Sequence, residues 1–170
     1  SYYEEARFAQ VFADIKRAPK AVEQQIAELP GVAALETSVV EDVTLDIPGV
    51  DEPVIGRMIG LNSNGKPGLN RLTLRTGRLP EREKRNEALV SEGFAKSHRL
   101  NPGDHVVALL NGKRERLEIV GIVLTPEYIF ASRGGDIPDD RGFGVLWMDR
   151  ERLASAFNML PLGRQPGLPD

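Results

Sequence analysis

The chain has 170 residues, of which 41% are hydrophobic and 28% charged, as in folded globular proteins and unlike disordered chains. Its formal net charge of −3 argues against a nucleic-acid partner, because nucleic-acid binding needs a basic face. No stretch approaches the roughly 20 apolar residues of a membrane-spanning helix, and the lack of cysteine excludes thiol catalysis, thiolate metal sites and disulfides.

Residues 1–76 alternate between strand-like and helix-like hydrophobic patterns. Val22, Ile26 and Leu29 recur at the spacing of one helical face, whereas residues 32–47 are apolar at every second position. Glu41 interrupts that apolar face and predicts a bulge or bend. In order, the patterns predict a strand at 9–17 (where a helix also fits), a helix from Pro19 to Leu29, and strands at 32–47, 53–61 and 71–75. This order favours an α+β sandwich of split-βαβ type with helices on one face of an antiparallel sheet.

Residues 77–125 are interpreted as a small β-rich unit inserted into the first. Its strongest signal is Asn111-Gly112 between two apolar runs, because both residue types tolerate the positive φ of a type I′ hairpin turn. The patterns predict a strand at 88–90, a helix opened by Ser91 and Glu92, and strands at 105–110 and 114–124.

Residues 126–159 return to the first unit, and residues 160–170 are predicted to be an irregular tail. Strands are expected at 128–131 and 143–148. Asp149 is expected to cap a final helix. The residues of that helix expected to face inward are Leu153, Ala156 and Phe157.

The chain offers few candidates for catalysis. Four acidic residues could gather around a divalent cation, since hard cations take several carboxylate oxygens: Glu127, Asp136, Asp139 and Asp140. Their spacing matches no EF-hand, however, and aspartate is common in turns for conformational reasons. The histidines, His98 and His105, fall on different predicted elements without a third ligand, so structural or surface roles are expected.

No motif indicates a nucleophile or a bound nucleotide. The serines lack the G-x-S-x-G context of a hydrolase, and neither a P-loop nor a G-x-G-x-x-G following a strand is present. We therefore predict no enzymatic activity, no catalytic residues, no cofactor and no metal.

Two further groups of residues bear on possible interactions. The basic run is offset by Glu81, Glu83 and Glu87 and is predicted to be a solvated loop; it consists of Arg71, Arg75, Arg78, Arg82, Lys84 and Arg85. Four aromatic residues are predicted to lie in the core: Tyr128, Phe130, Phe143 and Trp147. The turn-rich loop 134–142 is the surface best suited to recognition. The interaction residues predicted there and beside it are Tyr128, Asp136, Asp139, Asp140 and Arg141.

The order of several short motifs resembles the extracytoplasmic domain of FtsX/MacB-like ABC-transporter permeases, from about Tyr2 to Met159. Individually these motifs are weak, but their order and spacing are specific. They include Leu29-Pro30-Gly31-Val32, Arg75-Thr76-Gly77-Arg78-Leu79-Pro80, Glu87-Ala88-Leu89-Val90-Ser91-Glu92, Leu100-Asn101-Pro102-Gly103-Asp104, Val120-Gly121-Ile122-Val123 and Gly142-Phe143-Gly144-Val145-Leu146-Trp147.

The resemblance implies a porter-like α+β part, discontinuous in sequence, with an inserted sabre-like β-rich part at 77–125. It implies a periplasmic or otherwise extracytoplasmic location, between two membrane helices of an inner-membrane protein, with Tyr2 close to the helix that follows Trp147. The family usually adds another strand and helix before the second membrane segment, and residues 160–170 show neither.

By the same resemblance, the domain is non-catalytic. It would couple ATP-driven motion of an ATP-binding subunit, transmitted through the membrane helices, to handling of a lipid or protein substrate or an adaptor. Two alternatives stay open: a metal-assisted hydrolase using the acidic residues around 127–140, and a free-standing interaction module.

Overall fold

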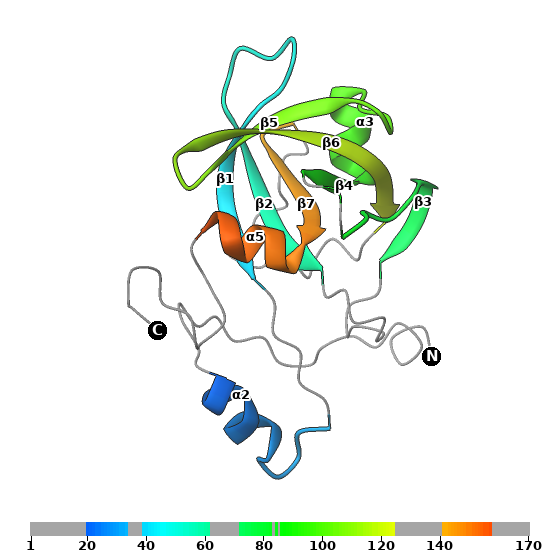
Figure 1. The fold of residues 1–170 in the computed structure, drawn as a ribbon. Helices are drawn as coiled ribbons and strands as arrows, with labels where there is room; N and C mark the ends of the chain where they lie inside the picture. The colour runs from blue at the N-terminus through cyan, green and yellow to red at the C-terminus, as the bar shows by residue number, and fades with distance from the viewer. Residues whose placement is uncertain are drawn as a thin grey trace.

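The structure is a computed structural model that describes residues 20–33, 39–61, 72–82, 84, 86–124 and 141–157. Within these residues the chain forms seven strands and three helices (Figure 1). The elements in chain order are α2 (Lys20–Ala27), β1 (Val40–Asp46), β2 (Val54–Leu61), β3 (Thr73–Gly77), β4 (Glu87–Ser91), α3 (Glu92–His98), β5 (His105–Leu110), β6 (Lys113–Leu124), β7 (Phe143–Asp149) and α5 (Arg150–Ala156).

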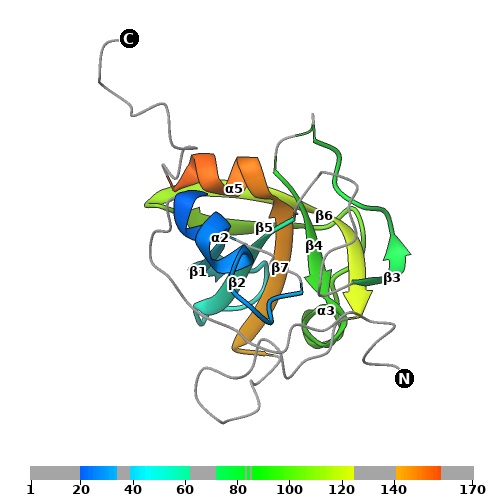
Figure 2. The same cartoon turned by 90° about the horizontal axis from the view of Figure 1, so that it is seen from below.

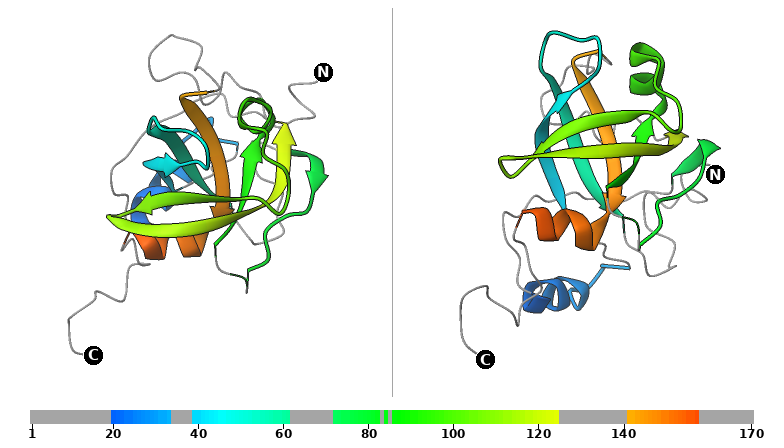
Figure 3. Two further views of the ribbon diagram at one scale, coloured as in Figure 1. Left: turned by 90° about the horizontal axis from the view of Figure 1, so that it is seen from above. Right: turned by 45° about the horizontal axis from the view of Figure 1, so that its top comes forward.

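The strands form one mixed sheet that closes on itself. The sheet order is β3-β6-β4-β7-β2-β1-β5, and β5 also pairs with β6. Six strands therefore make a ring, while β3 is attached to the outside of the ring through β6 (Figure 3). The pairs β2–β7 and β4–β6 are parallel and the other pairs are antiparallel. The α+β class is confirmed, but the expectation of an antiparallel sheet is wrong.

The closed ring gives the protein two apolar clusters on opposite faces of its strands. The first cluster takes residues from all six ring strands, so it fills the interior of the ring. The second takes residues only from β2, β4, β6 and β7 and lies on their outer face. Strand β7 shows the alternation directly, because Leu146 and Met148 belong to the interior cluster while Val145 and Trp147 belong to the outer one.

Two helices pack against the ring. Helix α5 contacts β2 and β7 and places Leu153 in the interior cluster, whereas α3 contacts β4, β6 and β7 and buries Phe94 and Ala95. The Asp149 side chain accepts a hydrogen bond of 3.0 Å from the Arg152 backbone N–H, which confirms the predicted cap. Helix α2 lies on the same side of the ring as α5 (Figures 1 and 2).

Most of the predicted elements within the described residues are confirmed. Asn111 and Gly112 have φ values of 51° and 79°, as the predicted turn between β5 and β6 requires. Ala156 and Phe157 pack on the interior cluster, as predicted. Of the bulge or bend expected at Glu41, the bulge is wrong, because the β1–β2 register runs without a shift from Val40 to Leu45. The predicted strands at 9–17 and 128–131, the position of Tyr2 and the tail 160–170 lie outside the described residues.

Strands from residues 77–125 pair with strands from both flanking parts of the chain. Strand β5 pairs with β1, and β4 pairs with β7. All of them therefore contribute to one sheet. The division into 1–76, 77–125, 126–159 and 160–170 stays a prediction, because pairing within one sheet does not by itself set subdomain boundaries.

Gly144 makes the interior packing testable. A Cβ atom added there would lie 2.5 Å from atoms of the Phe94 ring, which is fully buried. We expect Gly144→Ala to lower the free energy of unfolding by roughly 1–3 kcal/mol through overpacking. In urea denaturation, Phe94→Leu should relieve part of that loss, so the double variant should lose less than the sum of the two single variants.

Gly112→Ala is the matched control. A Cβ atom on Gly112 would have no neighbouring atom within 4 Å, but the φ of 79° disfavours alanine, so we expect a loss of about 1 kcal/mol. In the double variant Gly112→Ala/Phe94→Leu, the two losses in the free energy of unfolding should simply add. If the double variants of Gly112 and of Gly144 departed equally from additivity, the packing interpretation would be contradicted.

Candidate functional site

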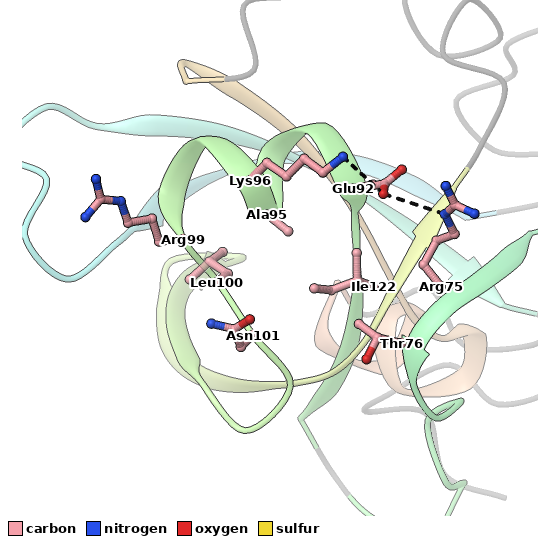
Figure 4. Close-up of a pocket in the computed structure, with 9 residues that line it drawn as sticks. All are labelled: Arg75, Thr76, Glu92, Ala95, Lys96, Arg99, Leu100, Asn101 and Ile122. Atoms are coloured by element: carbon pink, nitrogen blue, oxygen red, sulfur yellow. Dashed lines mark ion pairs between the residues drawn. The ribbon is translucent and has the colours of Figure 1, made fainter.

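A groove of about 560 Å³ lies between α3 and β3, with β6 at its floor (Figure 4). This volume falls in the range of sites that bind small molecules. The groove is lined by Arg75 and Thr76 from β3, Glu92, Ala95 and Lys96 from α3, Arg99, Leu100 and Asn101 from the segment after α3, and Ile122 from β6.

The spacing of residues on α3 explains why several of them face the groove. Glu92, Ala95 and Lys96 are three and four residues apart and therefore share one helical face. Phe94 and His98 lie on another face, where their rings are 4.5 Å apart and Phe94 joins the interior cluster. Helix α3 thus presents one face to the interior and another to the groove.

A bulge in β3 brings two consecutive residues to the groove. Leu74 pairs with Val123 and Thr76 pairs with Ile122, so Arg75 is an extra residue without a partner position in β6. Side chains of consecutive strand residues normally point to opposite faces, but a bulge redirects them locally. Arg75 and Thr76 can therefore both line the groove.

The groove carries a local positive charge. Its lining has three cationic side chains and one carboxylate, a formal net charge of +2, whereas the whole chain has −3. The Glu92 carboxylate lies 3.2 Å from the Lys96 ammonium and 3.6 Å from the Arg75 guanidinium. Hydrogen bonding from Lys96, aided by both positive charges, lowers the pKa of Glu92 below its usual range.

Arg99 differs from the other two cations. Its side chain has no ion pair or hydrogen bond with any residue that the structure describes, and it points away from the groove and from Arg75 (Figure 4). Its backbone is left-handed, with φ of 52°, because Arg99 ends α3. This positive φ sets the direction in which the Arg99 side chain leaves the backbone.

The floor of the groove is apolar and is bordered by uncharged polar groups. Ala95, Leu100 and Ile122 form the floor and are largely buried. The Thr76 hydroxyl and the Asn101 amide lie beside them (Figure 4). This arrangement suits a ligand with an anionic group, hydrogen-bonding groups and a short apolar part. Among the described residues, no group of three or more metal-ligating side chains is found.

A second charged pair holds β3 in place. The Glu87 carboxylate, whose side chain is 3% exposed, accepts hydrogen bonds from the Arg78 guanidinium at 2.5 and 2.9 Å and from the Glu81 backbone N–H at 2.9 Å. The hydrogen bonds from Arg78 lower the pKa of Glu87, although burial opposes that shift. Because Arg78 directly follows β3 and Glu87 begins β4, the pair fixes one wall of the groove.

The buried pair corrects part of the sequence interpretation. The basic run was expected to be a solvated loop, and Arg75, Arg82 and Lys84 are indeed exposed. Glu87, however, is buried, and Arg78 reaches it across nine residues of sequence. No hydrophobic period or short motif encodes such a contact, because it depends on how β3 and β4 are placed by β6.

Of the predicted interaction residues, the structure describes only Arg141. Its backbone carbonyl oxygen accepts a hydrogen bond of 2.8 Å from His98 Nε2, so the last residue of α3 contacts the end of the predicted recognition loop. The other four predicted residues and Glu127 lie outside the described residues: Tyr128, Asp136, Asp139 and Asp140. Trp147 belongs to the outer apolar cluster, as predicted for the core, and the partly buried Phe143 packs against that cluster. Phe130 lies outside the described residues.

The groove itself was missed by the sequence analysis, although a signal for it exists. Residues 92, 95, 96 and 99 mark a helical face that is mostly charged, opposite a face containing Phe94. A charged face is commonly a solvated one. Only the position of β3 beside α3 turns this face into the wall of a groove.

Comparison with known proteins shows a likeness at the level of the fold. No family model matches the chain, and no curated protein matches it significantly. Among solved structures, the extracellular domain of the noncanonical ABC-type transporter YknZ from Gram-positive bacteria matches with a TM-score of 0.50 and 16% identity, over 83% of this chain and 67% of that one. The periplasmic region of MacB from Actinobacillus actinomycetemcomitans matches with a TM-score of 0.45 and 13% identity, over 83% and 59% of the two chains.

The predicted resemblance to an extracytoplasmic domain of FtsX/MacB-like permeases is thus confirmed for the fold. At this level of identity, the likeness does not transfer residue roles. None of the helices formed by the described residues has the length and apolar character needed to cross a membrane.

The Glu87–Arg78 pair predicts a pH-dependent contribution to stability. Since folding lowers the pKa of Glu87 below 4.5, the stabilisation is present above that pH and is lost as pH falls through the lower pKa of the folded state. At pH 7, Glu87→Gln should lower the free energy of unfolding by about 2 kcal/mol. The difference from the parent chain should shrink below pH 4.5 in urea denaturation series.

Glu92→Gln provides the comparison, because Glu92 pairs with two exposed cations and should contribute less. A Glu87→Gln effect that stays constant down to pH 3, or that does not exceed the Glu92→Gln effect at pH 7, would show that the buried charge is not what holds β3.

Proposed function

We propose that this chain is a non-catalytic extracytoplasmic domain of an ABC-transporter permease. The observation that carries the proposal is the fold shared with the extracellular domain of YknZ. The order of motifs in the sequence supports it independently, because that order extends over most of the chain. Under this proposal, the natural location is outside the cytoplasm, and an ATP-binding subunit acts on the domain only through membrane helices.

The proposed work of the domain is mechanical coupling to substrate or partner handling. A domain that transmits motion must move as one body, and the closed ring favours this because each of its six strands has a hydrogen-bonded neighbour on both sides. Helices α3 and α5 add contacts that join neighbouring strands. The long hairpin of β5 and β6 projects beyond the ring and offers a surface to partners (Figure 3).

The location can be tested by thiol labelling in intact cells. The chain has no cysteine, so Lys113→Cys, in the exposed hairpin, adds the only thiol within these residues. In the full-length protein, a membrane-impermeant maleimide should modify this thiol before lysis. The parent protein and a cytosolic thiol protein serve as controls. Labelling only after lysis, or an open reading frame without hydrophobic spans flanking these residues, would contradict the proposal.

The coupling can be tested separately with spin labels in the full-length transporter. Labels at Lys113→Cys and Glu151→Cys lie at exposed positions of the hairpin and of α5. Their separation should stay constant between nucleotide-bound and nucleotide-free states, while the distance from either label to a membrane helix should change. A change within the domain, without a change relative to the membrane, would contradict movement as one body.

A further inference from the structure

Helix α5 is tied to the ring by a polar network of three residues, Arg152, Asn86 and Glu115. Arg152 Nη2 donates a hydrogen bond of 3.1 Å to Asn86 Oδ1 and lies 3.6 Å from Glu115 Oε1. Asn86 Nδ2 donates in turn to Glu115 Oε2 at 3.3 Å. We propose that this Arg152 network joins α5 to the β5–β6 hairpin, so that a force on α5 carries the hairpin with it. The inference rests on the mechanical role proposed above and names the residues that carry it out.

The three residues come from parts of the chain that are far apart in sequence. Arg152 lies on α5, Asn86 directly precedes β4, and Glu115 lies on β6. Within the hairpin, Glu115 pairs with Ala108 of β5, which is fully buried. The network therefore connects α5 to the part of β6 that forms the hairpin, and α5 lies close to this hairpin in the fold (Figures 1 and 3).

Asn86 is held in place by its own backbone. Its carbonyl oxygen accepts a hydrogen bond of 2.8 Å from the Glu118 N–H of β6. Its φ of 65° lies in the left-handed region, which asparagine enters more readily than most residues. Asn86 therefore presents its side-chain amide to Arg152 and Glu115 from a fixed position beside β6.

The other contacts of α5 define its direction less sharply. The helix packs on β2 and β7, and Leu153 enters the interior cluster. A Cβ atom on Gly60 would lie 3.0 Å from the Arg150 Cα atom, so the start of α5 rests directly on β2. Apolar burial is non-directional, whereas a charged hydrogen bond has a preferred distance and angle. Arg152 therefore sets how α5 is oriented toward the hairpin.

The network is a poor way to stabilise a helix, which favours a positioning role. Arg152 Nε is buried and has no hydrogen-bond partner among the described residues. A buried donor without an acceptor costs stability, and apolar side chains often replace a buried ion pair without loss. An apolar residue at position 152 would cover the interior at a lower cost, but it would not fix α5 against Glu115.

The first experiment measures how closely α5 is held to the hairpin in the purified chain. Spin labels are placed at Lys113→Cys in the hairpin and at Ser155→Cys on α5, both exposed positions. In the variant Arg152→Met/Glu115→Leu, the distribution of distances between the labels should broaden about twofold, because α5 loses its directional contact. The midpoint of urea denaturation should change by less than roughly 0.5 M, because apolar residues replace the ion pair.

Two further variants separate this joint from a general effect of charge. Arg82→Met is the matched control, because it removes a second ion pair of α5, between the exposed side chains of Arg82 and Glu151 at 3.6 Å. It should leave the distance distribution unchanged. Asn86→Gly keeps the positive φ and removes only the amide, so it should broaden the distribution. If Arg152→Met/Glu115→Leu does not fold, Asn86→Gly decides alone. Unchanged distributions, or equal broadening by Arg82→Met, would overturn the proposal.

The second experiment asks whether the joint transmits motion in the full-length transporter. Distances are measured from each label to a membrane helix, with and without nucleotide. In Arg152→Met/Glu115→Leu, the change at Ser155→Cys should persist, whereas the change at Lys113→Cys should fall by about half or more. Equal changes in this variant and in the parent would overturn the joint and leave the mechanical role standing. No change at either label in the parent would instead overturn the mechanical role, and this inference with it.

Discussion

The fold depends on strand β6 pairing with different partners along its length. Its first half, residues 113–118, pairs with β5, and its second half pairs with β4 and β3. If β6 ended at residue 118, the ring would stay open and β3 would have no sheet to join. A single strand of 12 residues therefore creates both the enclosed apolar interior and the wall that faces α3.

Closure also explains the close backbone contacts around Gly77 and Gly121. The register between β4 and β6 shifts after Ala88, which leaves Val120 as an extra residue on β6. The Val120 carbonyl oxygen accepts a hydrogen bond of 2.9 Å from the Arg78 N–H, so the chain leaving β3 passes directly over β6. A Cβ atom on Gly77 would lie 2.2 Å from that oxygen, and one on Gly121 would lie 2.6 Å from the Arg78 carbonyl oxygen. The ion pair of Arg78 with the buried Glu87 carboxylate then joins the chain that leaves β3 to the start of β4.

Local signals in the sequence predict the elements well but not their arrangement. The Asn111-Gly112 turn and the Asp149 cap are encoded within a few residues, because backbone conformation and one side-chain hydrogen bond decide them. The β1–β5 pairing that helps to close the ring joins Leu45 to Ala108, far apart in the chain, and no local pattern specifies it. The groove depends on the same long-range closure. Its residues are visible in the sequence as charged positions, yet their convergence is not.

The short edge strand β3 has two roles that place different demands on Arg75. An unpaired edge risks aggregation, and natural proteins protect such edges with short strands, bulges and charged side chains. Strand β3 has all three: five exposed residues, a bulge and Arg75 within the bulge. Edge protection alone would leave the guanidinium directed to solvent, but here it lies 3.6 Å from Glu92 across the groove.

This contact limits how strongly the groove can attract anions. Glu92 neutralises part of the charge of Arg75 and Lys96, and the third cation, Arg99, points away from the groove (Figure 4). The remaining attraction is that of one exposed cation, which salt screens over about 8 Å at physiological ionic strength.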